Sequence, residues 1–308
     1  MRLIFMGTPS AAVPTLQRCL EDGHDVVAVW TQPDRPSGRG NKLAQPPVKE
    51  FALKHGLAVY QPAKIRNKAA LRLFASHDAD LSVVVAYGRI LPTDFLRTPR
   101  RGCINVHFSL LPQYRGAAPV NWAIIRGERE TGVTTMLIDE GLDTGAMLLQ
   151  RATEIGEAET APELMSRLSL MGAELLGETL VRLDEISPRQ QSEEKATFAP
   201  ILQREYGLID WALDASQIER RVRGFQPWPN AYTTYNSQRL VIWSASVMRD
   251  EPQGSEGEII RARGDELVVR CGDETLLRVT EVQPEGKRRM SVRDFINGMR
   301  VRAGERFG

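Results

Sequence analysis

The first half of the chain alternates short apolar runs with amphipathic segments, and this alternation constrains the fold more than any other feature. Such an order is typical of a parallel, doubly wound sheet, because each crossover between parallel strands needs a covering helix. The strands we expect are Leu3–Met6, Asp25–Thr31, Leu57–Tyr60, Leu81–Ala86, Gly102–Val106, Gly132–Ile138 and Met147–Thr153. The helices we expect are Ala11–Leu20, Pro46–His55, Ala69–Ser76, Ala117–Arg126 and Ala161–Glu185. The first half is therefore predicted to be an α/β domain.

The pattern changes after a polar, non-periodic stretch that begins at Ser187. Beyond it, one helix over Ala215–Val222 precedes short strands separated by turn residues, a spacing that favours a small OB-like β-barrel. We expect those strands at Ala231–Tyr235, Arg239–Ser246, Gly257–Ala262, Leu267–Cys271 and Thr275–Glu281. The predicted organisation is a first domain over 1–187, a linker over 188–205 and a second domain over 206–308.

Length and composition bound the class of protein. The chain has 308 residues, enough for about two domains. Its formal net charge of +1 excludes the broad basic field of a bulk nucleic-acid binder. Three widely spaced cysteines indicate a reducing, cytoplasmic environment and argue against a metal site. No apolar run has the length of a membrane span, so we expect no membrane association.

Three polar side chains are the strongest candidates for chemistry. Asn105 and His107 lie two residues apart on an expected strand, so their side chains point to the same face. Asp143, from a glycine-flanked loop, could orient the imidazole and stabilise its charged form. An Asn-x-His pair on a strand is often a polar edge or a satisfied buried pair. Here it lies at the carboxyl end of a predicted parallel strand, where such sheets bind ligands.

Two basic segments are candidate contacts for a polyanion. The loop over 32–47 is rich in glycine and proline and carries Arg35, Arg39 and Lys42; a solvated loop is the alternative. The stretch from 286 to 306 contains seven Lys/Arg residues and two acidic ones. A charge run is usually a solvated face, but on an OB-like barrel it favours contact with phosphates. Trp211, Trp228 and Trp243 are expected in packing roles, and Gly7-Thr-Pro9 is interpreted as a structural turn.

The chain resembles the methionyl-tRNA formyltransferase family over almost its whole length. The resemblance rests on Phe5-Met-Gly-Thr-Pro9, Thr31–Gly40, Asn105–Pro119 and Asp139–Gly145. The Asn105–Pro119 motif also occurs in formyltransferases that act on small amines. The second half of the chain distinguishes the tRNA family from those enzymes, through the motifs Ile209-Asp-Trp211, Pro227-Trp-Pro229 and Gln283–Met290. Two departures are visible: Ser10-Ala11 replaces an acidic or small residue followed by Phe, and Ile201 replaces a common lysine. Because Ile201 carries no charge, the sequence does not support a contact between the linker and RNA at this position.

The resemblance implies a Rossmann-like formyltransferase domain followed by an OB-like tRNA-binding domain. It implies transfer of the formyl group of 10-formyltetrahydrofolate to the α-amine of methionyl initiator tRNA, without a metal, by a monomer. Asn105, His107 and Asp143 would be catalytic. The folate would lie near Arg89, Ile90, Leu91, Ser109, Leu110, Leu111, Pro112, Asp139 and Gly141. The tRNA would contact Arg35, Arg39, Lys42, Lys287, Arg288 and Arg289.

Two alternatives stay open on the sequence alone. A formyltransferase acting on a small amine would keep the three catalytic groups but need neither the basic loop nor the barrel. A non-catalytic RNA-binding protein on the same scaffold would have no physical need for all three groups.

Overall fold

The computed structural model describes residues 1–37, 42–249 and 254–308 and divides into two compact units. Unit 1 comprises Met1–Pro119, Glu130–Glu154 and Met165–Ala199; unit 2 comprises Val120–Arg129, Ile155–Leu164 and Pro200–Gly308. Within the described ranges, no helix has both the length and the apolar character needed to cross a membrane.

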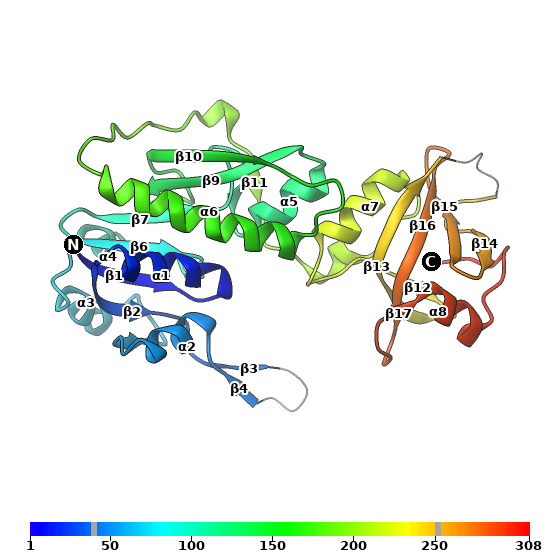
Figure 1. The fold of residues 1–308 in the computed structure, drawn as a ribbon, viewed down its shortest axis with the longest axis horizontal. Helices are drawn as coiled ribbons and strands as arrows, with labels where there is room; N and C mark the ends of the chain where they lie inside the picture. Colours follow the sequence, from blue (N-terminus) through cyan, green and yellow to red (C-terminus); the bar gives the residue numbers. More distant parts are fainter. Residues whose placement is uncertain (38–41, 250–253) are drawn as a thin grey trace. The chain divides into compact units, whose positions relative to one another are not determined.

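Unit 1 is built on a seven-stranded sheet of order β10-β9-β7-β6-β1-β2-β5 (Figure 1). Five neighbouring strands run parallel, as predicted: β1 (Arg2–Gly7), β2 (Asp25–Trp30), β5 (Val59–Tyr60), β6 (Leu81–Val85) and β7 (Cys103–His107). β9 (Glu130–Leu137) runs antiparallel to both of its neighbours, so β10 (Met147–Glu154) again points in the direction of β7. The sequence pattern predicted parallel strands here as well. No helix crosses over between β9 and β10, so β10 returns beside β9 in the opposite direction.

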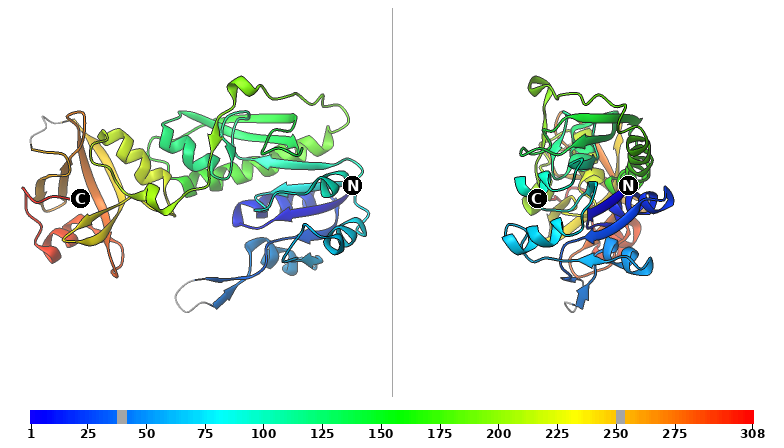
Figure 2. Two further views of the ribbon diagram at one scale, coloured as in Figure 1. Left: turned by 180° about the vertical axis from the view of Figure 1, so that it is seen from behind. Right: turned by 90° about the vertical axis from the view of Figure 1, so that its left-hand side faces the viewer.

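Helices cover both faces of this sheet. Helices α1 (Val13–Glu21) and α6 (Ala161–Val181) lie on one side, and α3 (Lys68–Ala75) and α4 (Thr93–Arg97) on the other (Figure 2, right). Burial on both faces explains why every residue of β6 is both buried and, apart from one serine, aliphatic. Unit 1 also contains α2 (Pro47–Lys54), whereas α5 (Pro119–Arg126) lies almost wholly in unit 2.

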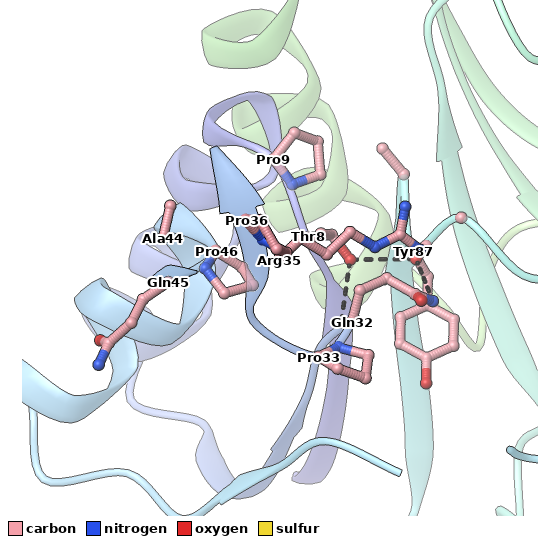
Figure 3. A pocket seen from close by; sticks show the side chains of 12 residues that line it. Thr8, Pro9, Gln32, Pro33, Arg35, Pro36, Ala44, Gln45, Pro46 and Tyr87 are labelled. Atoms are coloured by element: carbon pink, nitrogen blue, oxygen red, sulfur yellow. Dashed lines mark hydrogen bonds between the residues drawn. The ribbon is translucent and has the colours of Figure 1, made fainter. Parts of the chain in front are cut away.

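The strand order reverses between β1 and β6: the chain continues from β1 to β2 on one side and later adds β6 and β7 on the other. Crevices at such reversals, outside the carboxyl ends of the strands, are where open α/β sheets bind ligands. A pocket of about 460 Å³ lies there. The residues around it come from the segments that follow β1, β2 and β6 (Figure 3).

Unit 2 contains an antiparallel sheet of order β12-β13-β16-β15-β14, with β17 added beside β16. The strands are β12 (Tyr232–Tyr235), β13 (Gln238–Met248), β14 (Ile259–Arg263), β15 (Glu266–Arg270), β16 (Leu276–Pro284) and β17 (Met290–Ser291). Helices α7 (Ala215–Gly224) and α8 (Val292–Met299) belong to the same unit. The predicted antiparallel second domain is thus confirmed, whereas α8 was not predicted.

The last residues of the chain connect the two edge strands of this sheet. Ile259 on β14 donates its amide to Glu305 O at 2.8 Å and accepts the Gly304 amide at 2.9 Å. On β12, Thr234 O accepts the Gly308 amide at 3.2 Å. The terminal segment therefore links β14 to β12, the closure that an OB-like barrel requires. Trp211, predicted to pack, is buried with Phe295 and Phe307 in this core.

Candidate active site

Asn105 and His107 lie on β7, and His107 is its last residue. The pairing of β7 with β6 on one side and β9 on the other fixes the backbone of both residues. His107 is buried, with 6% of its surface exposed, whereas Asn105 is half-buried. Among the described residues, the Asn105 side chain has no hydrogen-bond partner, so its amide is available to a ligand.

The imidazole of His107 has two distinct neighbours. Its Nε2 lies 3.0 Å from the carbonyl oxygen of Tyr114, and its Nδ1 lies 3.7 Å from Oδ2 of Asp143. A carbonyl oxygen can only accept, so Nε2 carries the hydrogen. In the neutral ring Nδ1 therefore holds the lone pair, and a proton taken up there would face the Asp143 carboxylate. The predicted pairing of His107 with Asp143 is present in the geometry, and the orienting hydrogen bond comes from Tyr114.

The loop between β9 and β10 carries Asp143. Its Oδ2 accepts the backbone amide of Gly116 at 2.8 Å, which fixes the carboxylate beside His107. The two flanking glycines are required for close approach. A Cβ at Gly145 would lie 1.8 Å from Leu137 O, and one at Gly141 would lie 2.0 Å from Thr144 Oγ1. The glycine-flanked spacing around Asp143 is thus a packing requirement of the loop.

Three non-glycine residues beside these groups have left-handed backbone conformations. They are Ala86 with φ of 45°, Tyr114 with φ of 62° and Asp143 with φ of 53°. Ala86 lines the pocket, Tyr114 holds His107, and Asp143 faces it. Such conformations cost about 1–3 kcal/mol each and cluster at functional sites. Two of these strained residues, Tyr114 and Asp143, are the two neighbours of the His107 ring.

The predicted folate segment over 109–112 is tied to the neighbouring strands. Ser109 is fully buried and donates from Oγ to Gln113 O at 2.6 Å, and Leu111 is also buried. Thr134 on β9 accepts the Leu111 amide at 3.1 Å, and Gln150 on β10 donates to Leu111 O at 2.8 Å. Leu110 and Pro112 are half-buried. Ser109 and Leu111 therefore shape the site from below its surface.

The other predicted folate residues lie on two loops. Arg89 donates to Gln32 Oε1 at 3.1 Å and to Pro62 O at 3.2 Å, which holds the segment after β6 in place. Asp139 accepts the Gly141 amide and the Thr144 hydroxyl within its own loop. Two large apolar side chains on these loops face solvent: Ile90 is 64% exposed and Leu142 is 54% exposed. Leu142 was not predicted, although an apolar residue inside a glycine-rich loop could have indicated it.

The pocket at the strand-order reversal adds residues that sequence reasoning missed. Thr8 donates to Tyr87 O at 3.0 Å, and Gln32 donates to the same oxygen at 3.1 Å, so three segments meet at one carbonyl (Figure 3). Burial raises the pKa of the Tyr87 hydroxyl to about 12. Pro9, Pro33, Pro36 and Pro46 line much of the rest. The turn at Gly7-Thr-Pro9 is therefore structural and also a wall of the pocket.

The predicted basic loop forms a short hairpin, β3 (Arg35–Ser37) and β4 (Lys42–Ala44). Arg35 is exposed and lines the pocket. Arg39 lies outside the described residues, and for Lys42 only the backbone is described. Of the three predicted cations, the structure thus brings Arg35 to the pocket.

The predicted basic cluster of unit 2 is partly neutralised. Arg289 pairs with Glu281 and lies over the Trp243 ring, 5.0 Å from its centroid. Lys287 and Arg288 are exposed and, among the described residues, have no acidic partner. Of the three cations predicted to contact tRNA in unit 2, these two are available to a phosphate. The expected packing role is wrong for Trp228, which is 52% exposed.

The described residues contain no group of three or more His, Cys, Asp or Glu side chains that could hold a metal ion. Cys19, Cys103 and Cys271 are unpaired and buried. Burial raises the pKa of each thiol to about 12. Because the thiolate is the nucleophile and ligand, these thiols are inert near neutral pH.

Comparisons with known proteins agree with this geometry. The family model described as formyl transferase matches residues 1–180, and the one described as formyl transferase, C-terminal domain, matches residues 201–300. A methionyl-tRNA formyltransferase of Caldanaerobacter subterraneus subsp. tengcongensis is 48% identical over 307 residues, 99% of each chain. One of Geobacter metallireducens is 49% identical over 310 residues, covering 100% of this chain and 99% of the relative.

A solved structure supports the fold independently. The crystal structure of WlaRD, a sugar 3N-formyl transferase, in the presence of dTDP and 5-N-formyl-THF, superposes with a TM-score of 0.68. It is 17% identical, and the match covers 94% of this chain and 99% of that one. The full-length identity to the two relatives and the two matching family models leave one assignment: the chain belongs to the methionyl-tRNA formyltransferase family.

Proposed function

We propose that this chain transfers the formyl group of 10-formyltetrahydrofolate to the α-amine of methionyl initiator tRNA. The observation that carries the proposal is that Asp143, from the loop after β9, faces His107 on β7, the strand that also carries Asn105, in a chain of this family. An amide donor, a proton acceptor and a carboxylate are the groups that acyl transfer to an amine needs. The amine is itself a good nucleophile, so no covalent enzyme intermediate is required.

Asn105 supplies the donor to the oxygen on which negative charge develops. Its amide has no partner among the described residues, and its backbone is held by strands on both sides. A donor that is already in place pays no reorganisation cost during the reaction, which is why one such donor is worth about 10²–10³ in rate.

The amine nitrogen bonds to the formyl carbon, and the bond from that carbon to the 10-nitrogen of the folate breaks. His107 takes the proton that the attacking amine loses and returns it to the 10-nitrogen, so that tetrahydrofolate leaves. Its Nε2 hydrogen is committed to Tyr114 O, so the proton is accepted at Nδ1. The Asp143 carboxylate, 3.7 Å away, then stabilises the imidazolium. Because His107 is 6% exposed, water screens this pair weakly.

The loops around the site fit a flat ring with polar edges. Ile90 and Leu142 offer apolar side chains, and the backbone over 89–91 and 139–141 offers donors and acceptors. The solved sugar formyltransferase was crystallised with 5-N-formyl-THF, which supports a folate as the group held in such a fold. We assign folate contacts to these loops and to Leu110 and Pro112. The bound cosubstrate supplies the formyl group; the residues named here orient it.

The tRNA is assigned to two basic surfaces, Arg35 beside the pocket, with Arg39 and Lys42 of the same loop, and Lys287 to Arg289 in unit 2. The catalytic domain expected over 1–187 would extend up to Ala199, which lies in unit 1, and 206–308 would be the tRNA-binding domain. As the family resemblance implies, the enzyme would work as a monomer. Three unpaired thiols suit the cytoplasm.

The direct test is formyl transfer from 10-formyltetrahydrofolate to methionyl initiator tRNA, with methionyl elongator tRNA and free methionine as parallel acceptors. We expect transfer to the initiator at a rate well above that to either other acceptor. Transfer to free methionine at an equal rate would contradict the tRNA-dependent function. Absence of transfer to all three acceptors would contradict the proposed activity.

A further inference from the structure

A segment outside the family's catalytic motif holds both partners of His107. We call residues 189–199 the clasp. Thr197 Oγ1 accepts the amide of Tyr114 at 2.9 Å, and Tyr114 O in turn receives the His107 hydrogen bond. At its other end Arg189 exchanges two backbone hydrogen bonds of 2.8 Å with Met147, next to the Asp143 loop. The clasp therefore spans from the residue that orients His107 to the loop that carries Asp143.

Gln191 is the point at which the clasp grips the Asp143 loop. Its Nε2 donates to the carbonyl oxygens of Asp143 and Gly145, each at 2.8 Å. An amide NH₂ has two hydrogens, so this one group satisfies both carbonyls at once. Asp143 has φ of 53°, a conformation that persists only where the surroundings hold it. The Gln191 amide supplies that hold.

The Gln191 side chain is itself fixed. Its Oε1 accepts from Nε of Arg115 at 2.9 Å. Arg115 is 1% exposed, and its two terminal nitrogens bind the two carboxylate oxygens of Glu193, both at 2.9 Å. This bidentate pair fixes the plane of the guanidinium, so that only one orientation of Gln191 satisfies all partners. Arg115 is followed directly by Gly116, whose amide binds the Asp143 carboxylate.

We propose that Gln191 is a positioning residue for formyl transfer: held by Arg115, it fixes the Asp143 loop so that the carboxylate faces Nδ1 of His107. The inference rests on the proposed function for its catalytic consequence, and on geometry alone for the positioning. Gln191 touches neither the reacting atoms nor His107, so it acts through Asp143.

The test compares Gln191→Met, which keeps the length of the side chain and removes both donors, with Gln190→Met. Gln190 is the adjacent, exposed glutamine, which makes it a matched control. We expect Gln191→Met to lower kcat by about 10- to 100-fold, the cost of misplacing a catalytic group, with KM for methionyl-tRNA unchanged. In a double variant with Asp143→Asn, Gln191→Met should cause no further loss of kcat, because both substitutions remove the same function. A full multiplicative loss in the double variant would overturn the proposal.

A second readout needs no activity. The Gly116 amide binds the Asp143 carboxylate, so its hydrogen exchange, followed by NMR in the protein without substrates, reports where that carboxylate lies. We expect exchange about tenfold faster in Gln191→Met and unchanged in Gln190→Met. Unchanged exchange in Gln191→Met would overturn the positioning role. If wild type transfers no formyl group, the proposed function fails, and this measurement still decides the positioning.

Discussion

The His107 imidazole donates from Nε2 to the main-chain carbonyl of Tyr114, at 3.0 Å. This hydrogen bond assigns the two ring nitrogens different tasks: Nε2 anchors the ring, and Nδ1 is left to exchange a proton beside Asp143. A main-chain carbonyl cannot titrate, so the tautomer is fixed by the backbone. The Tyr114 turn is thus as much a part of the site as the three polar side chains.

Gly116 is where the turn after Tyr114 meets the clasp most closely. A Cβ there would lie 2.6 Å from Ala199 O, and φ is 123°. We expect Gly116→Ala to lower the free energy of unfolding by about 1–3 kcal/mol and to slow formyl transfer, since the Gly116 amide holds Asp143. Thermal unfolding would measure the loss of stability, and kcat would measure the slower transfer. Gly298→Ala in α8 is the control: its site is open, and alanine favours the helix by up to about 1 kcal/mol. Equal melting temperatures for Gly116→Ala and wild type would be incompatible with this packing.

The exposed cations of unit 2 predict a salt dependence. We expect Arg288→Ala to weaken tRNA binding and to reduce the slope of log K against log salt by about 0.7–0.9, because one phosphate contact is lost. Arg293→Ala is the matched control, because Arg293 is already paired with Asp265. Binding isotherms at several salt concentrations would measure both. The same slope for Arg288→Ala and wild type would remove Arg288 from the interface.

The barrel closure predicts how stability depends on pH. The Tyr235 hydroxyl donates to Glu305 at 2.6 Å. Burial, and then this bond, raise the pKa of Tyr235 from 10.0 to about 12. The protonated hydroxyl therefore contributes fully to the free energy of unfolding below pH 10, and this contribution is lost between about pH 10 and 12. The bond also lowers the pKa of Glu305 from its ordinary value of 4.5. The ionised carboxylate therefore contributes to the free energy of unfolding above pH 4.5, and this contribution is lost as the pH falls through the lowered pKa.

We therefore expect Tyr235→Phe to destabilise unit 2 by about 1 kcal/mol near neutral pH and to flatten its stability at both extremes. Thermal melts at a series of pH values would measure this. Melts of Tyr235→Phe that depend on pH as steeply as those of wild type would contradict the closure.

Much of the fold was predictable because it follows from local pattern. The buried run at Leu81–Val85 and the helix that ends near Arg126 are both visible as hydrophobic periodicity. The reversed direction of β9 was not, because the direction of a strand depends on its connections rather than on its composition. The hairpin of β3 and β4 was missed because its strands are three residues long and β3 contains a proline.

The residues of the candidate site also fall into those that could be predicted from the sequence and those that could not. Asn105, His107 and Asp143 could be named because their chemistry is concentrated in two motifs. The contributions of Tyr114 and Gln191 could not: one acts through its backbone carbonyl, and the other lies in a polar stretch with no periodicity. That stretch was expected to be linker from residue 188, whereas contacts place the chain up to Ala199 within unit 1. Its pairing with β8 (Arg115–Gly116) spans only two residues, too few to leave a sequence pattern.

The most direct test of the account is single-turnover formyl transfer by Asn105→Ala, measured with saturating 10-formyltetrahydrofolate and methionyl initiator tRNA. Loss of one preorganised donor predicts a rate lower by about 10²–10³. The dissociation constants of both substrates and the melting temperature should match those of wild type. A rate near that of wild type would contradict the assigned role of Asn105 and, with it, the mechanism.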